Sequence, residues 1–143
     1  MGRSEDLHTE QADDSAKVAV DSLRVGQVLR ARRHVTEADI AAFAALVGDE
    51  GSHHMQGAER IMAHGLLTAS LATKIGGRID FIAQHMSWHF LRPVWAGDTI
   101  SAEVGVRAVR EARSGTGLEL DVVIVNQHGD EVLRGESTGV VRG

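Results

Sequence analysis

Hydrophobic positions change their spacing along the chain, and these changes divide the sequence into predicted elements. Between Thr36 and Gly48 the apolar residues recur at helical spacing: Ile40, Phe43, Leu46 and Val47. Thr36 suits the N-cap of this helix, and Glu37 and Asp39 lie in the first turn, where they favour the helix dipole. We expect an amphipathic helix that ends at Gly48.

The stretch that follows His64 is apolar or small on nearly every side, and Lys74 is the charged residue within it. Its other members are Leu66, Leu67, Ala69, Ser70, Leu71, Ala72 and Ile75. A helix that is apolar on most sides is buried, and this run is shorter than the roughly 20 apolar residues that span a membrane. We expect a buried central helix over about residues 64–75, stopped by Gly76 and Gly77.

Strand patterns fill most of the remaining chain. Alternation of apolar and polar residues and β-branched side chains predict strands at 28–35, 79–90, 99–110, 118–126 and 131–141. In the strand at 99–110 one face is apolar: Ile100, Ala102, Val104, Val106 and Ala108. Pro93 is expected to mark a bulge or a strand end. Turns are expected at 96–98 and, as a hairpin, at 127–130.

These elements describe a single α+β domain over residues 18–143, in which an antiparallel sheet wraps around the helix at 64–75. Such a sheet has open edges, and pairing them in a homodimer or a higher homo-oligomer is a common way to cover them. Residues 1–17 are polar and acidic and lack periodicity, which predicts a disordered tail. They also lack the apolar segment of a secretory signal.

Composition narrows the possible functions. The formal net charge of −5 gives no electrostatic reason to bind nucleic acid or an acidic membrane surface. The chain contains no cysteine, which excludes disulfides and thiolate catalysis. We therefore expect a cytoplasmic protein with neither a nucleic-acid partner nor a membrane partner.

A polar loop joins the two predicted helices and gathers titratable side chains between Gly48 and Gly51 and beyond: Asp49, Glu50, His53 and His54. Titratable groups on a Gly-rich turn beside a helix start are one arrangement that acid–base chemistry uses. A solvated surface turn has the same composition, so both interpretations stay open on local sequence alone.

A metal site is the third interpretation of this region, because five histidines lie in one third of the chain: His53, His54, His64, His85 and His89. His85 and His89 fall on one predicted strand, where a four-residue spacing separates them by about 13 Å. That distance is too large for one shared ion, and no other strong ligand spacing is present. We expect no metal site.

Several motifs, taken in order, resemble the MaoC-like hotdog proteins, which include the (R)-specific enoyl-CoA hydratases. The motifs lie at 36–49, 63–70, 90–99 and 126–129. The family's loop pattern is Gly-Asp-x-Asn-Pro-x-His, with the Asp and the His as the catalytic pair, and it falls here on Gly48 to His54. The resemblance implies that Asp49 and His54 are catalytic and that the Gly65 N–H is the oxyanion-hole donor. It also implies a supporting hydroxyl at Thr73. His53 and His64 are further candidate supporting residues, and the alternatives are that His53 faces solvent and that His64 is structural and fixes the entry to the helix.

The function implied by the resemblance is addition or removal of water at a 2-enoyl thioester carried by CoA or by an acyl carrier protein, without a cofactor. A helix N-terminal N–H polarises the thioester carbonyl, and an imidazole and a carboxylate that share one water supply the acid–base steps. The central helix carries no Asp or Glu over 66–75, which argues against a thioesterase or a dehydratase of the other hotdog type.

The sequence departs from the family pattern in the loop. Gly51 and Ser52 replace the Asn-Pro pair, Gln56 replaces an acidic residue, and the segment before Ala63 is shorter by about one small helix. The alternative function is therefore an acyl-thioester-binding protein with weak or diverted activity, and a purely structural role is a further class. A wider entrance would favour a bulkier or branched acyl group.

Three aromatic residues and one arginine follow the buried helix: Trp88, Phe90, Trp95 and Arg92. The aromatic residues are interpreted as core or dimer contacts, with an acyl-binding wall as the alternative. Arg92 is a candidate contact for a CoA phosphate, on the weaker ground of its charge alone.

Overall fold

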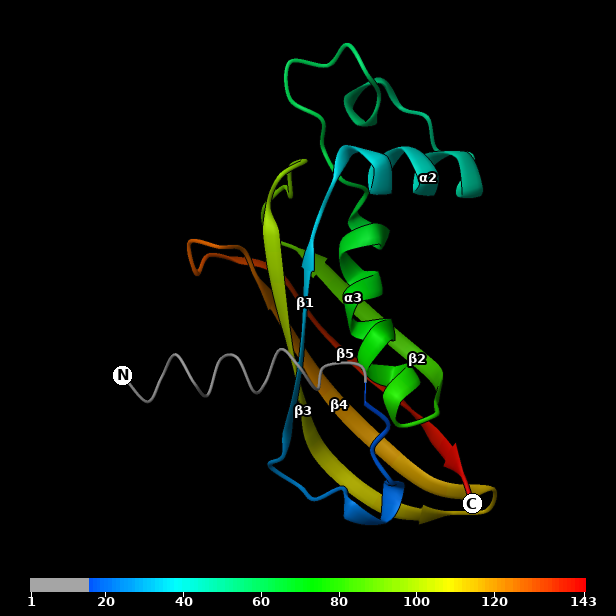
Figure 1. Cartoon of the computed structure of the whole chain (residues 1–143). Coiled ribbons are helices and arrows are strands. Elements are labelled where there is room, and N and C mark those ends of the chain that lie inside the picture. The colour runs from blue at the N-terminus through cyan, green and yellow to red at the C-terminus, as the bar shows by residue number, and fades with distance from the viewer. Residues whose placement is uncertain (1–15) are drawn as a thin grey trace.

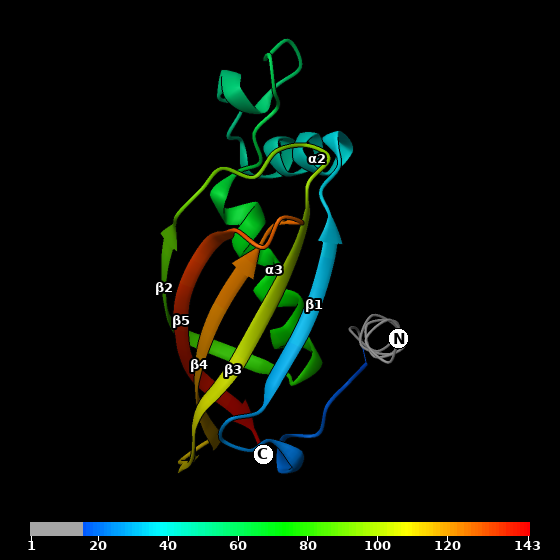
Figure 2. The same cartoon turned by 90° about the vertical axis from the view of Figure 1, so that its left-hand side faces the viewer.

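The computed structural model describes residues 16–143 and confirms an α+β domain. In chain order its elements are η1 (Val20–Ser22), β1 (Val28–His34), α2 (Glu37–Val47), η2 (Ser52–His54), α3 (Gly65–Arg78), β2 (Phe81–Phe90), β3 (Thr99–Ala112), β4 (Gly115–Val125) and β5 (Glu131–Arg142). The strands form an antiparallel sheet in the order β1-β3-β4-β5-β2. Helix α3 lies along one face of this curved sheet (Figure 1), and the strand order is visible in the view turned by 90° (Figure 2).

The core lies between α3 and the inner face of the sheet. In β3 the residues Ile100, Ala102, Val104 and Val106 are buried and alternate with more exposed ones, as the sequence predicted. Leu71 and Ile75 of α3 are fully buried against this face. Burial of each side chain of this size contributes about 1.5–3 kcal/mol, which is why an amphipathic sheet and a small-residue helix hold together.

Helix α2 begins with the predicted cap and crosses the amino end of α3 (Figure 1). The Thr36 hydroxyl accepts from the Asp39 N–H at 3.0 Å, and the Asp39 carboxylate accepts from the Thr36 N–H at 3.0 Å. The predicted apolar stripe is only partly confirmed, because Ile40 is buried but Leu46 is 83% and Val47 51% exposed. The last turn of α2 therefore carries its apolar side chains outside the core.

The predicted end of the central helix was wrong. Helix α3 continues through Gly76 and Gly77 to Arg78, and the chain turns at Asp80, which has a φ of 54°. Glycine in a helix interior costs about 1 kcal/mol relative to alanine. Burial of Ile75 and Ile79 on either side outweighs that cost.

The predicted turns are confirmed, and the proline has a more limited role. Gly97 has a φ of 96° in the turn before β3, and Gly129 has a φ of 81° in the β4–β5 hairpin. Strand β2 ends at Phe90, before Pro93, whereas the irregularity in its pairing with β5 lies at 83–85. Pro93 therefore follows a strand end and does not form the bulge.

The tail predicted at 1–17 falls mostly outside the described residues. Its last two residues contact the carboxyl end of α3: the Arg78 guanidinium donates to the Ala16 carbonyl, and Lys17 forms an ion pair with Asp80. These contacts tie residues 16 and 17 to the end of the central helix and the turn that follows it. Within residues 16–143, no helix combines the length and the apolar character needed to cross a membrane.

Candidate active site

The connection between α2 and α3 carries the predicted catalytic residues and is anchored at both ends. Gly48 ends α2 in the left-handed conformation, with a φ of 80° and its N–H bonded back into the helix, and this turns the chain at Asp49. At the other end, Met62 forms a β-bridge with Trp95. The connection is therefore held against the segment between β2 and β3.

Two of the departures from the family pattern have local structural roles. A Cβ on Gly51 would lie 2.9 Å from Cε1 of His53, so the glycine leaves room for that ring. The amide of Gln56 donates to the Glu37 carboxylate at 2.7 Å, which ties the connection to the first turn of α2. Contacts of Gly51 and Gln56 therefore restrain the connection.

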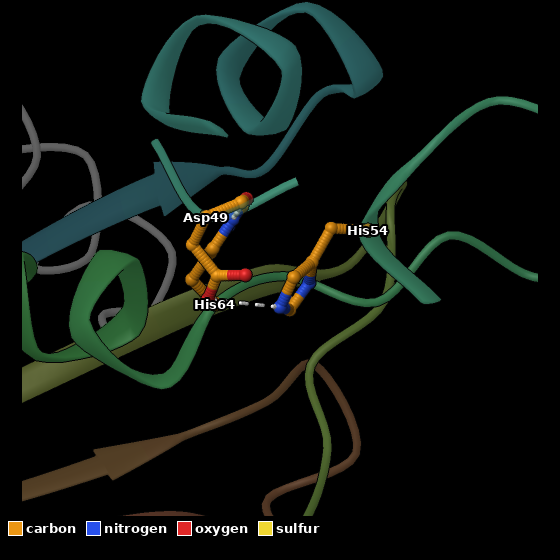
Figure 3. A group of neighbouring side chains, drawn as sticks. All are labelled: Asp49, His54 and His64. Atoms are coloured by element: carbon orange, nitrogen blue, oxygen red, sulfur yellow. Dashed lines mark hydrogen bonds and ion pairs between the residues drawn. The ribbon is translucent and has the colours of Figure 1, made fainter. Parts of the chain in front are cut away.

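His54 is buried, and its hydrogen bond fixes which ring nitrogen is available for chemistry. Nδ1 lies 2.6 Å from the Met62 carbonyl, which only accepts, so Nδ1 carries a proton and, in the neutral ring, Nε2 carries the lone pair. Nε2 faces the Asp49 carboxylate (Figure 3) and lies 3.7 Å from its Oδ2; the Asp49 side chain is 58% exposed. Because 3.7 Å is too long for a direct hydrogen bond, the two acceptors face each other across a gap.

His64 lies beside this pair and immediately precedes α3. It is 3% exposed, and its Nε2 lies 2.9 Å from the Asp49 backbone carbonyl. The rings of His64 and His54 are stacked, with centroids 3.6 Å apart and planes 16° apart. Phe43 of α2 contacts the His64 ring at a centroid distance of 4.9 Å.

A cavity of about 800 Å³ opens at the amino end of α3. The predicted site residues that line it are Asp49, His53, His54, His64 and Gly65. As the first residue of α3, Gly65 has an N–H with no acceptor inside the helix. Phe90 packs so closely on Gly65 that an added Cβ would lie 2.8 Å from the phenyl ring.

Thr73 is the predicted supporting residue that the structure does not bring to this cavity. It lies about 12 Å further along α3, at 1.5 Å per residue, and lines a second cavity of about 200 Å³. Trp88 also lines this second cavity, whereas Phe90 and Arg92 line the first. Trp95 instead packs under Arg60, with Cζ 4.0 Å from its ring centroid.

Two further contributors to the first cavity were missed by the sequence analysis. The Met62 carbonyl fixes the tautomer of His54, and no sequence signal announces a backbone contact of this kind. Buried Thr68 also lines the cavity. It lies four residues after His64 on the same helix face, and this spacing could have identified it. Gly51 and Ser52 do not line the cavity, so their small size does not widen it directly.

Within the described residues, Asp49, His54 and His64 have the composition of a metal site, and their ligand atoms lie within 4.8 Å of one another. The geometry argues against shared coordination. A ring nitrogen directs its lone pair in the plane of the ring, and two rings stacked at 16° direct theirs almost in parallel. One nitrogen of each histidine also faces a backbone carbonyl. The set suits acid–base chemistry better than it suits a metal ion.

The chain is similar in sequence to known hydratases and dehydratases. An (R)-specific enoyl-CoA hydratase from Aeromonas caviae is 36% identical over 107 residues, which cover 66% of this chain and 78% of the relative. A mitochondrial 3-hydroxyacyl-acyl-carrier-protein dehydratase from Arabidopsis thaliana is 30% identical over 132 residues, covering 83% of this chain and 78% of the relative. No protein-family model matches the chain.

The fold agrees with these relatives. The solved structure of the (R)-hydratase from A. caviae involved in PHA biosynthesis matches with a TM-score of 0.76 and 33% identity, over 85% of this chain and 99% of that chain. Solved structures with this fold include protein complexes. The chain therefore belongs to the MaoC-like hotdog family of (R)-specific enoyl-CoA hydratases and 3-hydroxyacyl-acyl-carrier-protein dehydratases, which are lyases.

Proposed function

We propose that the first cavity hydrates a 2-enoyl thioester of CoA or an acyl carrier protein, or catalyses the reverse dehydration. Asp49 and His54 are the acid–base pair, and the Gly65 N–H is the oxyanion donor. The observation that carries this proposal is the gap of 3.7 Å between two acceptors, His54 Nε2 and Asp49 Oδ2, in the cavity that Gly65 also lines.

The gap suits one water molecule. A water about 2.8 Å from both acceptors donates one hydrogen to Nε2 and the other to Oδ2, which leaves its lone pairs free to attack. As its oxygen bonds to C3 of the substrate, one proton passes to the pair and the C2=C3 electrons move toward the thioester. The pair then returns a proton to C2, so the reaction consumes one water and no cofactor.

The amino end of α3 stabilises the charge that develops in this reaction. The thioester oxygen becomes negative as C3 is attacked, and an unpaired N–H at a helix N-terminus, aided by the helix dipole, is a suitable donor. Gly65 supplies such an N–H in the same cavity as the pair. Supporting contacts come from His53 and His64, whose rings flank His54 at 3.9 and 3.6 Å.

Hydration of crotonyl-CoA by the wild type, Asp49→Asn and His54→Ala tests the proposal. We expect wild-type turnover and a loss of kcat of about 10²–10⁴-fold in each variant, the usual range for an acid–base group. Binding of a saturated acyl-CoA, measured by calorimetry, supplies the control. A wild type that binds acyl-CoA without hydrating crotonyl-CoA or a longer enoyl-CoA would support the acyl-thioester-binding alternative.

We also propose a homodimer formed through β2. Among the described residues this edge strand pairs with β5 alone, and it exposes apolar side chains, namely Ile82, Met86 and Phe90. The opposite edge strand, β1, carries Arg30, Arg32, Arg33 and His34, and charged edges resist pairing. Sedimentation should show a dimer for the wild type and for Val28→Lys on β1, and a monomer for Met86→Lys on β2. A monomeric wild type would exclude this arrangement.

The expected cytoplasmic location stays a prediction.

A further inference from the structure

His64 touches each of the three parts of the proposed site. Its Nε2 lies 2.9 Å from the Asp49 carbonyl, its ring is stacked on His54, and it is the N-cap of the helix that Gly65 begins. Its side chain makes no cap hydrogen bond, so holding the helix end is not its role. The side chain is instead directed to the residues of the acid–base pair.

The contacts of His64 fix its tautomer. A carbonyl accepts only, so the nitrogen facing Asp49 is Nε2–H. Nδ1 is buried and has no hydrogen-bond partner among the described residues, and a proton there would meet no acceptor. These contacts place a proton on Nε2 and favour the tautomer with an unused lone pair on Nδ1. Unpaired buried nitrogens are rare in native proteins, which calls for an explanation beyond packing.

The neighbours of His64 explain why a histidine fits this position. An aromatic ring is needed to stack on His54 on one side and to contact Phe43 on another. A donor is needed at the ring edge that faces the Asp49 carbonyl. Phenylalanine would supply only the ring, and glutamine only the donor. The unpaired Nδ1 is the consequence of meeting both requirements with one side chain.

We propose that His64 is a positioning residue that sets the separation between Asp49 and His54. It holds the backbone of Asp49 by a hydrogen bond and the ring plane of His54 by stacking. The positions of both groups therefore depend on the same buried ring. The inference rests on the proposed function, because the 3.7 Å gap matters only if a water reacts there. Displacement of a reacting group by about 1 Å costs about a hundredfold in rate, so loss of this restraint has a kinetic consequence.

The first test reads the tautomers directly and needs no turnover. Long-range ¹H–¹⁵N correlation spectra of the wild-type histidine rings should show the proton of His54 on Nδ1 and that of His64 on Nε2. A His64 ring protonated on Nδ1 would overturn the inference, even in an active enzyme. An inactive wild type with the expected tautomers would overturn the proposed function and leave the geometric assignment of His64 in place.

The second test separates the stack from the hydrogen bond. His64→Phe keeps a ring and loses the donor, and we expect kcat to fall at least about tenfold while KM for the enoyl-CoA changes by less than about twofold. His64→Gln restores a donor at a similar reach and should recover part of kcat. The matched control is His128→Phe in the exposed β4–β5 turn, which should behave as the wild type. A folded His64→Phe with wild-type kcat would refute the role of the hydrogen bond, a folded His64→Gln with wild-type kcat would refute that of the stack, and wild-type kcat in both variants would refute the positioning role.

Discussion

Both ends of α3 carry glycine, and the two ends line different cavities. At the amino end, His64 and Gly65 line a cavity of about 800 Å³ that also contains Asp49 and His54. At the carboxyl end, Gly76 and Gly77 line a cavity of about 200 Å³ with mostly apolar walls. Titratable groups therefore gather at the positive end of α3, and a mostly apolar cavity lies at its other end.

The space around the glycines differs between the two ends of α3. A Cβ on Gly65 would lie 2.8 Å from the Phe90 ring, so this position needs glycine for close approach. A Cβ on Gly77 would meet nothing within 4 Å, and one on Gly76 would only touch Phe81 at 3.9 Å. The difference shows that composition alone does not locate a site, because identical residues are required at one end and tolerated at the other.

Removing the Gly65 N–H should have the largest effect of the predictions that follow. Proline is well tolerated at the first helical position, and His64, with φ −63° and ψ 142°, already has the conformation that precedes proline. We expect Gly65→Pro to lower kcat for enoyl-CoA hydration by about 10²–10³-fold relative to Gly65→Ala, as for loss of one oxyanion donor.

Gly65→Ala is the necessary reference for that comparison, because its added Cβ displaces Phe90 as the proline ring also does, while its N–H remains. Circular dichroism and thermal unfolding establish that both variants fold. Equal kcat values in the two variants would remove Gly65 from the chemistry and make the two ends of α3 equivalent.

Local chemistry explains what the sequence could predict. The cap at Thr36, the turn at Gly97 and the alternation in β3 depend on neighbouring residues, and the structure confirms each. The end of α3 and the exposure of Leu46 were mispredicted, because both depend on which surfaces the sheet reaches. Tertiary packing there overrides the local pattern.

Some features of the candidate site were likewise predictable from the sequence, and others depend on tertiary packing. The resemblance to the family's loop motif was enough to select Asp49 and His54, and the structure brings the two together in one cavity. The stacked ring of His64 and the Met62 carbonyl depend on how the connection returns to α3, and no spacing in the sequence encodes that path. Thr73 matched a family position but lies in the other cavity of this chain.

At the carboxyl end of α3, an added methyl group should stabilise the protein. Gly77 has open space around its Cα, so Gly77→Ala gains helix propensity without a clash. We expect the free energy of unfolding to rise by about 0.5–1 kcal/mol and Tm by about 2–4 °C in thermal unfolding. A loss of stability would mean that this glycine has a packing role like that of Gly65, and the contrast between the two ends would weaken.

The smallest effect is expected at Thr73, which is exposed and lines the second cavity. Thr73→Val keeps the shape of the side chain and removes its hydroxyl, so kcat/KM for enoyl-CoA hydration should stay within about twofold of wild type, as for a surface change of about 0.5 kcal/mol. Steady-state kinetics of enoyl-CoA hydration by the assembled protein measures this kcat/KM. A loss of tenfold or more would show that this hydroxyl acts in the reaction, and since it lies about 12 Å from Gly65 along its own helix, it would have to reach the acid–base pair of a second copy.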